Sequence, residues 1–290
     1  MTNVVEFNHV SKSFKDFSLK DVTFSIKKGY ITGFIGSNGA GKSTTIKLLM
    51  NLLKKDSGDI TIFGLDQNKY NQEIKSRIGF VYDENCFYDT LTIKELRKII
   101  APMYPKWNDD LFYKYVDQFR LPEKQQVKSF SKGMKMKLAI VFAISHDPEF
   151  IVMDEPTSGL DPVFRREILE ILHEIMLDEQ KTIFFSTHIT TDLDRIADYI
   201  TYIHKGQILF SKEREELLAE YGIVKGKNDL LDRDTEKEFV SIRKTGVGFE
   251  ALTSNVKKTM NLFGDEVLIE KPSLEDIMYY TDKGNLSCTH

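Results

Sequence analysis

The sequence predicts an α/β protein whose core is a mostly parallel β-sheet. Short apolar runs typical of buried strands alternate with helical patterns, and a glycine-rich loop follows an early strand. This alternation stops at about 84–147, where helical signals follow one another. We therefore expect one domain over residues 1–215, with N-terminal antiparallel strands and an inserted helical subdomain. A small C-terminal α/β appendage is expected over 216–290.

Strand and turn signals come first along the chain. Val4–Phe7 indicates a short strand, and residues 19–26 alternate apolar and polar side chains, as a half-buried strand does. Lys28-Gly29 marks a turn after them. A second turn at residues 57–59 precedes a predicted strand at 60–63.

Three helices are expected in the inserted block. Thr92 and Glu95 have the spacing of a capping box, in which side chain and backbone cap each other at a helix start. Asn108 is positioned to cap a second helix, and Ser131 a third that ends near residues 146–148.

Beyond this block the strand–helix alternation resumes. Phe150–Met153 and Thr182–Ser186 are apolar runs that indicate buried strands. Residues 165–177 carry apolar side chains at helical spacing, and residues 199–210 indicate a hairpin.

The last quarter of the chain is more charged. The composition turns charged from about Lys212, and we interpret Gly222–Asp234 as a linker. Short strands are expected at 238–243 and 266–269, with helical stretches between and after them.

The bulk composition excludes some classes of protein. A net charge of −4 over 290 residues argues against a general nucleic-acid binder. We expect no signal peptide and no membrane-spanning segment, since no apolar run approaches the necessary length. Cys86 and Cys288 lack metal-ligand spacing, so buried or free thiols in a reducing cytosol are expected.

A glycine-rich loop predicts nucleotide binding. Gly36–Ser43 fits the pattern G-x-x-x-x-G-K-[ST], between a predicted strand at Ile31–Ile35 and a predicted helix at Thr44–Met50. In such a loop successive N–H groups face one anion, and the helix N-terminus adds partial positive charge. Lys42 would reach the β- and γ-phosphates, and Ser43 would hold Mg²⁺. The residues expected to bind the nucleotide here are Gly36, Ser37, Asn38, Gly39, Ala40, Gly41, Lys42, Ser43 and Thr44.

Two adjacent acids end the predicted strand at 150–153. There Asp154 can bind Mg²⁺, mostly through water, while Glu155 can activate an attacking water as a general base. A solvated acidic turn is the alternative interpretation.

Three more short motifs make the chain resemble the nucleotide-binding subunit of an ABC transporter, over residues 1 to about 215. Ser131–Lys135 stands where that family carries its signature, usually L-S-G-G-Q. Ser158–Asp161 matches the family's D-loop, and His188 matches its switch histidine. The order and spacing of these motifs with the phosphate loop carry the resemblance.

The resemblance implies a site shared by two chains. ATP bound to one chain would be covered by Ser131, by backbone N–H groups near Gly133 and by the helix N-terminus of the other. His188 would contact the γ-phosphate, and Asp161 would link the two sites. A second nucleotide-binding chain is thus implied, either a second copy or a sister ATPase, together with a separate transmembrane permease.

The chain departs from the family pattern at three places. Asp83 stands where glutamine is usual, and the resemblance implies that it orients water or binds Mg²⁺, with solvent exposure or turn capping as the alternative. In the signature, Phe130, Lys132 and Met134 replace Leu, Gly and Gln; Lys132 would add positive charge or simply be solvated. Phe14 stands at the aromatic position that stacks on adenine, where tyrosine is commoner.

The implied function is ATP hydrolysis that powers export. The chain most resembles ATPase subunits of phenol-soluble-modulin (cytolytic peptide) exporters, which also contribute to antimicrobial-peptide defence. A drug or antibiotic exporter is the alternative, and a non-transport ATPase fits less well. We expect a peripheral location on the cytoplasmic face of the membrane. The segment with Asn85, Phe87 and Tyr88 would be the socket for a short coupling helix of the permease, unless these aromatic side chains belong to the subdomain core.

Overall fold

The computed structural model describes residues 2–83 and 86–287, so Glu84, Asn85 and Cys288 lie outside the described residues. The chain divides into two compact units, Met1–Ser211 and Lys212–His290. The second unit begins before residue 216, because the segment Arg214–Glu220 is already one of its helices, α8.

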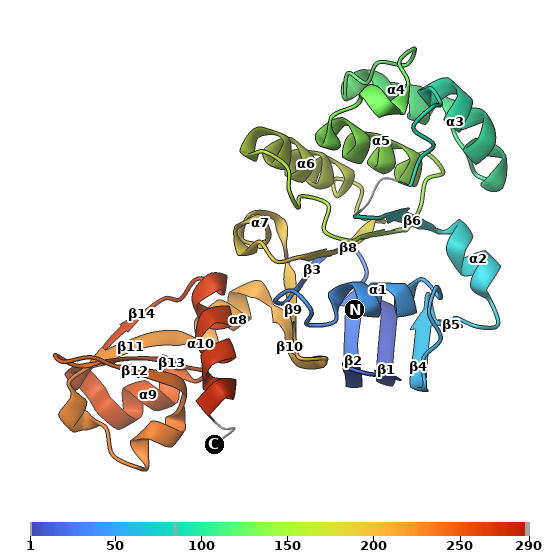
Figure 1. Ribbon diagram of the computed structural model, residues 1–290. Coiled ribbons are helices and arrows are strands. Elements are labelled where there is room, and N and C mark those ends of the chain that lie inside the picture. The colour runs from blue at the N-terminus through green and yellow to red at the C-terminus, as the bar shows by residue number, and fades with distance from the viewer. Residues whose placement is uncertain (1, 84–85, 288–290) are drawn as a thin grey trace. The chain divides into compact units, whose positions relative to one another are not determined.

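A six-stranded sheet forms the centre of the first unit (Figure 1). Its strand order is β10-β9-β3-β8-β7-β6, and the pairs β9/β3, β3/β8, β8/β7 and β7/β6 are all parallel. Parallel strands end at the same edge of a sheet, so the loops after β3, β7 and β8 gather there. The strands are β3 (Ile31–Ile35), β6 (Ile78–Val81), β7 (Phe150–Met153), β8 (Thr182–Thr187), β9 (Tyr199–His204) and β10 (Gln207–Glu213).

An antiparallel sheet with the order β2-β1-β4-β5 completes this unit. β1 and β2 are longer than their apolar patterns suggest, since the ladder continues past irregularities where His9 and Asp21 adopt left-handed backbone conformations. These strands are β1 (Asn3–Ser13), β2 (Ser18–Lys27), β4 (Ser57–Ile62) and β5 (Leu65–Asp66).

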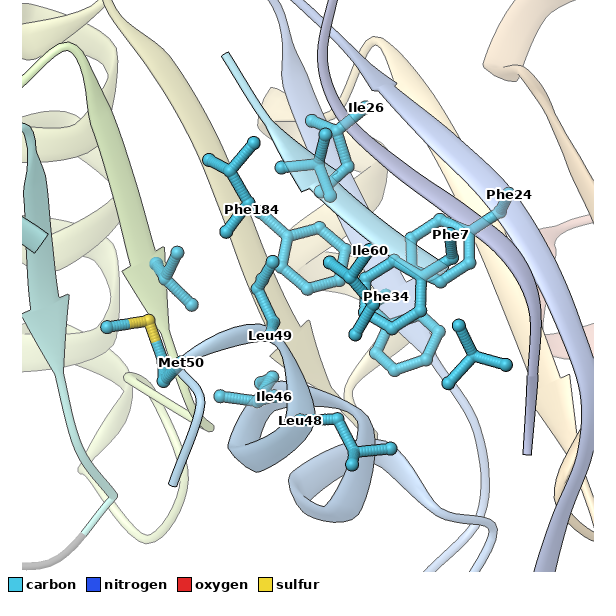
Figure 2. Close-up of a cluster of buried hydrophobic side chains, with 14 of the residues drawn as sticks. Phe7, Phe24, Ile26, Phe34, Ile46, Leu48, Leu49, Met50, Ile60 and Phe184 are labelled. Atoms are coloured by element: carbon cyan, nitrogen blue, oxygen red, sulfur yellow. The ribbon is translucent and has the colours of Figure 1, made fainter. Parts of the chain in front are cut away.

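Helix α1 (Lys42–Leu49) packs into an aromatic core that both sheets share. Figure 2 shows Phe34 and Phe184 of the parallel sheet beside Phe7 and Phe24 of the antiparallel sheet. Ring centroids lie 4.7 Å apart for Phe7 and Phe24 and 5.3 Å apart for Phe34 and Phe184. Burial of Ile46, Leu48 and Leu49 against these rings fixes the helix that follows the phosphate loop.

The expected caps of the helical block are confirmed. Thr92 and Glu95 form the reciprocal capping box of α3 (Ile93–Ile100). Asn108 accepts from the N–H of Leu111 at the start of α4 (Asp109–Gln118), and Ser131 caps α5 (Lys132–Ile144). The remaining α-helices described in this unit are α2 (Asn71–Ser76), α6 (Pro162–Ile175) and α7 (Thr190–Ile196).

The second unit is a four-stranded antiparallel sheet with the order β12-β13-β11-β14. The interpretation of Gly222–Asp234 as a linker is wrong, because Gly222–Gly226 forms the inner strand β11, in which Ile223 and Val224 are buried. The glycines at both ends of β11 made this strand resemble a linker, although its side chains pack on both faces of the sheet. The other strands described here are β12 (Phe239–Lys244), β13 (Phe249–Thr253) and β14 (Leu268–Glu270), and the α-helices besides α8 are α9 (Val256–Phe263) and α10 (Leu274–Ser287).

Over residues 2–83 and 86–287, none of the helices combines the length and the hydropathy needed to cross a bilayer.

Candidate functional site

The loop between β3 and α1 depends on its glycines. Gly39 and Gly41 have φ angles of 80° and 115°, in the region that side chains rarely adopt. Gly36 passes so close to β9 that a Cβ atom there would lie 2.4 Å from the carbonyl oxygen of Ile203. The backbone conformation and the close contact with β9 therefore explain, on steric grounds, why this loop needs glycine at residues 36, 39 and 41.

Lys42 lies inside this loop, with 6% of its side chain exposed. Its ammonium donates to the carbonyl oxygens of Gly36, at 2.8 Å, and Ser37, at 3.3 Å. A carboxylate oxygen of Glu155 lies 3.2 Å away. The loop therefore holds a desolvated cation, whose burial costs free energy unless partners of opposite polarity surround it.

Glu155 connects the loop to the end of β8. One carboxylate oxygen faces Lys42, and the other lies 2.7 Å from Nδ1 of His188. The backbone of Glu155 is left-handed, with φ of 49°, and its N–H donates to Ser186 Oγ at 3.0 Å. Strain of this kind persists only where neighbouring contacts hold it, and it is common at functional sites.

Asp154 is buried immediately before Glu155. Burial raises the pKa of its carboxyl group, the hydroxyl groups of Ser186 and Ser43 lower this pKa, and the charges of Asp83 and Glu155 raise it further. Ser186 Oγ donates to Asp154 at 2.6 Å. The site thus gathers three acids close to one buried lysine.

A cavity of about 750 Å³ opens over these groups. Asp83 lines it from the end of β6, and His188 lines it from the end of β8. Its full lining is Asp16, Phe17, Asn38, Gly39, Gly41, Lys42, Ser43, Thr44, Asp83, Lys132, Glu155, Ser158 and His188.

Phe17, which the sequence analysis did not single out, is the aromatic side chain that lines this cavity. Phe14, the expected adenine-stacking residue, is 46% exposed and stacks on Phe17 with ring centroids 6.3 Å apart. Both aromatics stand in the same short segment, so the pattern alone did not distinguish them.

Ser131, Gly133 and Asp161 lie outside this lining. Ser131 Oγ accepts from the N–H of Met134 at 3.2 Å, and Asp161 accepts from two backbone N–H groups at the start of α6. A Cβ atom on Gly133 would lie 2.6 Å from the ring of Phe164, so glycine lets α5 approach α6 closely.

A buried polar cluster supports the loop between β7 and α6. Asp192 of α7 is 2% exposed; it accepts from the hydroxyl of Thr157 at 2.7 Å and from Nε of Arg165 at 3.1 Å. No motif in the sequence marked these residues, because their contacts join segments far apart in the chain.

The oxygen groups at the site fit Mg²⁺. Ser43 and Asp154 offer a hydroxyl and a carboxylate side by side, and Asp83 lines the same cavity. Within the described ranges no cluster of three or more His, Cys, Asp or Glu side chains could hold a metal by itself. Mg²⁺ usually takes one or two carboxylates and completes its shell with water and phosphate oxygens, so a small set of protein ligands suffices.

A second, mostly apolar cavity of about 870 Å³ lies beside the first. Phe87 lines it, whereas Tyr88 is exposed. Asp83 and Lys132 line both cavities. The full lining of the apolar cavity is Lys47, Leu52, Phe80, Tyr82, Asp83, Cys86, Phe87, Ile100, Met103, Tyr104, Lys132, Lys135, Met136, Ala139, Phe142 and Ala143.

The known proteins that this chain resembles agree with the phosphate-binding site described above. Residues 19–158 match the ABC transporter family. The bacitracin transport ATP-binding protein BcrA of Bacillus licheniformis is 35% identical over 212 residues, which cover 72% of this chain and 69% of that protein. The lantibiotic transport ATP-binding protein SrtF of Streptococcus pyogenes is 33% identical over 72% of this chain and 91% of its own length.

A solved structure described as the ATP binding subunit of an ABC transporter is similar too. It has a TM-score of 0.66 and 28% identity, and the match covers 74% of this chain and 92% of that one. The chain belongs to the ATP-binding subunits of ABC transporters, and it is an ATPase whose hydrolysis of ATP is coupled to transport.

The raised pKa of Asp154 makes a prediction about stability. A carboxyl group with a raised pKa in the folded protein stabilises the fold at low pH, and this contribution is lost as pH rises through the raised pKa. Asp154→Asn removes the buried charge but keeps an acceptor for Ser186. Without Mg²⁺ at neutral pH, we expect a melting temperature higher by about 2–4 °C, the shift that about 1 kcal/mol produces.

The gain should shrink as pH falls, because the wild-type carboxyl group is then protonated. Thermal melts over a pH series measure it, with the exposed Asp117→Asn as the matched control. A difference in melting temperature between wild type and Asp154→Asn that stays the same at every pH would contradict the account.

Proposed function

We propose that this chain is one ATPase subunit of an exporter that moves amphipathic peptides through a separate membrane subunit. The observation that carries the ATPase part is the continuous contact from Lys42 through Glu155 to His188. The peptide part is supported by two relatives named for bacitracin and lantibiotic transport. It is also supported by the sequence resemblance to phenol-soluble-modulin exporters.

In this proposal the phosphate groups of ATP compete with Glu155 for the ammonium of Lys42. The backbone N–H groups of the loop and the N-terminus of α1 add further positive potential. Ser43, Asp154 and Asp83 would hold Mg²⁺, which when bound offsets the charge of the phosphates. Once Lys42 turns to phosphate, Glu155 can accept the proton of an attacking water, and His188 keeps the Glu155 carboxylate oriented.

The position of Ser131, Gly133 and Asp161 supports a site built from two chains. All three lie outside the cavity of their own chain, at the N-termini of the long helices α5 and α6. We therefore assign Ser131 and backbone N–H groups near Gly133 to the nucleotide of a partner ATPase, and Asp161 to the contact between the two sites. The partner is a second copy of this chain or a sister ATPase.

The apolar cavity supports the second partner. Its lining contains the aromatic side chains of Phe80, Phe87 and Phe142, together with three lysines, Lys47, Lys132 and Lys135. A short helix of the membrane subunit is the occupant that the family resemblance implies, and docking there would place the chain on the cytoplasmic face of the membrane. Of the three expected contact residues, Phe87 lies in the lining and Asn85 is outside the described residues.

Reconstitution tests the cargo. The chain, purified with its membrane subunit and placed in lipid vesicles, should hydrolyse ATP several-fold faster when an amphipathic helical peptide is added. A peptide of the same composition in scrambled order, which has no apolar face, is the control. Stimulation by small drugs but not by the amphipathic peptide would favour the drug-exporter alternative and overturn the peptide assignment.

Glu155→Gln tests the chemistry. Glutamine cannot accept the proton of water, so turnover should fall by roughly 10²–10⁴-fold. ATP should bind at least as tightly as in wild type, since the neutral side chain competes less for Lys42. Bound but unhydrolysed ATP should then hold two chains together, which sedimentation in the presence of ATP measures.

Glu170→Gln is the matched control, because this exposed glutamate of α6 pairs only with the neighbouring-turn Arg166 among the ion pairs described. Turnover by Glu155→Gln close to that of wild type would rule out the general-base assignment.

A further inference from the structure

Lys132 ties the start of α5 to the loop that follows β7. Its ammonium donates to the backbone carbonyl oxygen of Ser158 at 2.6 Å. This contact joins the signature region to the segment Ser158–Asp161, which leads into α6. A hydrogen bond from a charged donor is stronger than a neutral one, so it can hold a loop at a defined position.

The loop is shaped to receive this lysine. Gly159 has φ of 65°, and a Cβ atom there would lie 2.6 Å from the Lys132 ammonium. Any side chain at residue 159 would therefore be strained and would also displace Nζ. Glycine at this position and lysine at residue 132 fit one another.

Two further contacts run along the same pair of helices. Gly133 lies against the ring of Phe164, and Lys137 donates to Glu167 at 2.6 Å. The first contact joins the first turns of α5 and α6, and the second joins their second turns. Lys132 extends the attachment to the loop itself, where Asp161 begins α6.

Lys132 also lies where the two cavities meet. Lys132 lines both the nucleotide cavity and the apolar cavity, as Asp83 also does. A protein segment that fills the apolar cavity would touch the side chain that also holds the loop at Ser158. The contact is thus placed where occupancy of one cavity can alter the other.

We propose that Lys132 is a positioning residue that fastens the Ser158–Asp161 loop to α5, so that Ser131 and Asp161 meet the partner ATPase as one rigid unit. The assignment of those two residues to the partner rests on the proposed function. The competing role is direct binding of phosphate by the ammonium, which the lining of the nucleotide cavity would also allow.

Three variants of the full chain separate these roles. Lys132→Met removes both the charge and the donor. Lys132→Gln removes the charge but keeps an N–H donor for the Ser158 carbonyl. Lys128→Met is the matched control, because Lys128 is an exposed lysine that lines neither cavity and precedes the same helix.

Amide hydrogen exchange, in the absence of nucleotide and partner, measures how firmly the Lys132–Ser158 hydrogen bond, here called the tether, holds the loop. In wild type the N–H of Ser158 bonds to the carbonyl of Glu155, and that of Leu160 bonds to Thr157. Lys132→Met should speed exchange of these amides about 10-fold, the mark of a loop that opens more easily. Lys132→Gln should restore most of the protection, and Lys128→Met should leave it unchanged. Equal exchange in wild type and Lys132→Met would overturn the tether.

ATPase kinetics test the positioning role. Lys132→Met should lower kcat about 10-fold with little change in KM, and Lys132→Gln should recover kcat to within about 3-fold of wild type. A raised KM in both variants would assign the ammonium to phosphate and overturn the proposal. Faster exchange with unchanged kcat would show a structural contact alone and would also overturn it.

Failure of the proposed function has a different signature. Wild type without ATPase activity would refute that function while leaving the exchange result interpretable.

Discussion

The buried ammonium of Lys42 is the interaction on which the rest of the site depends. With 6% of its side chain exposed, it meets two carbonyl oxygens of its own loop and the carboxylate of Glu155. A charge this far from water is stable only where the surrounding dipoles and counter-charge are fixed. The need to fix them explains both the glycines of the loop and the strained backbone of Glu155.

The fold satisfies that constraint through its sheet. β3 and β7 both pair with β8 in parallel, so the phosphate loop, the acids and His188 emerge at one edge. The aromatic core beneath α1 holds the loop from the other side, because the helix cannot shift without exposing Ile46 and Leu49 (Figure 2). The lysine, the acids and the histidine are thereby held together by packing as well as by charge.

Much of this was predictable from the sequence, because the informative signals are local. The phosphate loop, the strand before Asp154 and the three helix caps each lie within a few residues, and glycine, apolar and capping patterns report such short segments well. The hydrogen bond from Lys132 to Ser158 and the buried Asp192 cluster were missed, since both join distant segments through ordinary residue types. β11 was missed because a short strand between two glycines has the composition of a linker.

The most direct test of the central claim is the affinity of Lys42→Ala for a non-hydrolysable ATP analogue with Mg²⁺, measured by calorimetric titration beside wild type and the exposed Lys94→Ala. Removal of a buried charge that contacts a charged ligand typically costs 2–5 kcal/mol, so the dissociation constant should rise by at least about 30-fold. Lys94→Ala should bind as wild type does. Equal affinities for wild type and Lys42→Ala would contradict the account, because phosphate binding would then not depend on the buried ammonium.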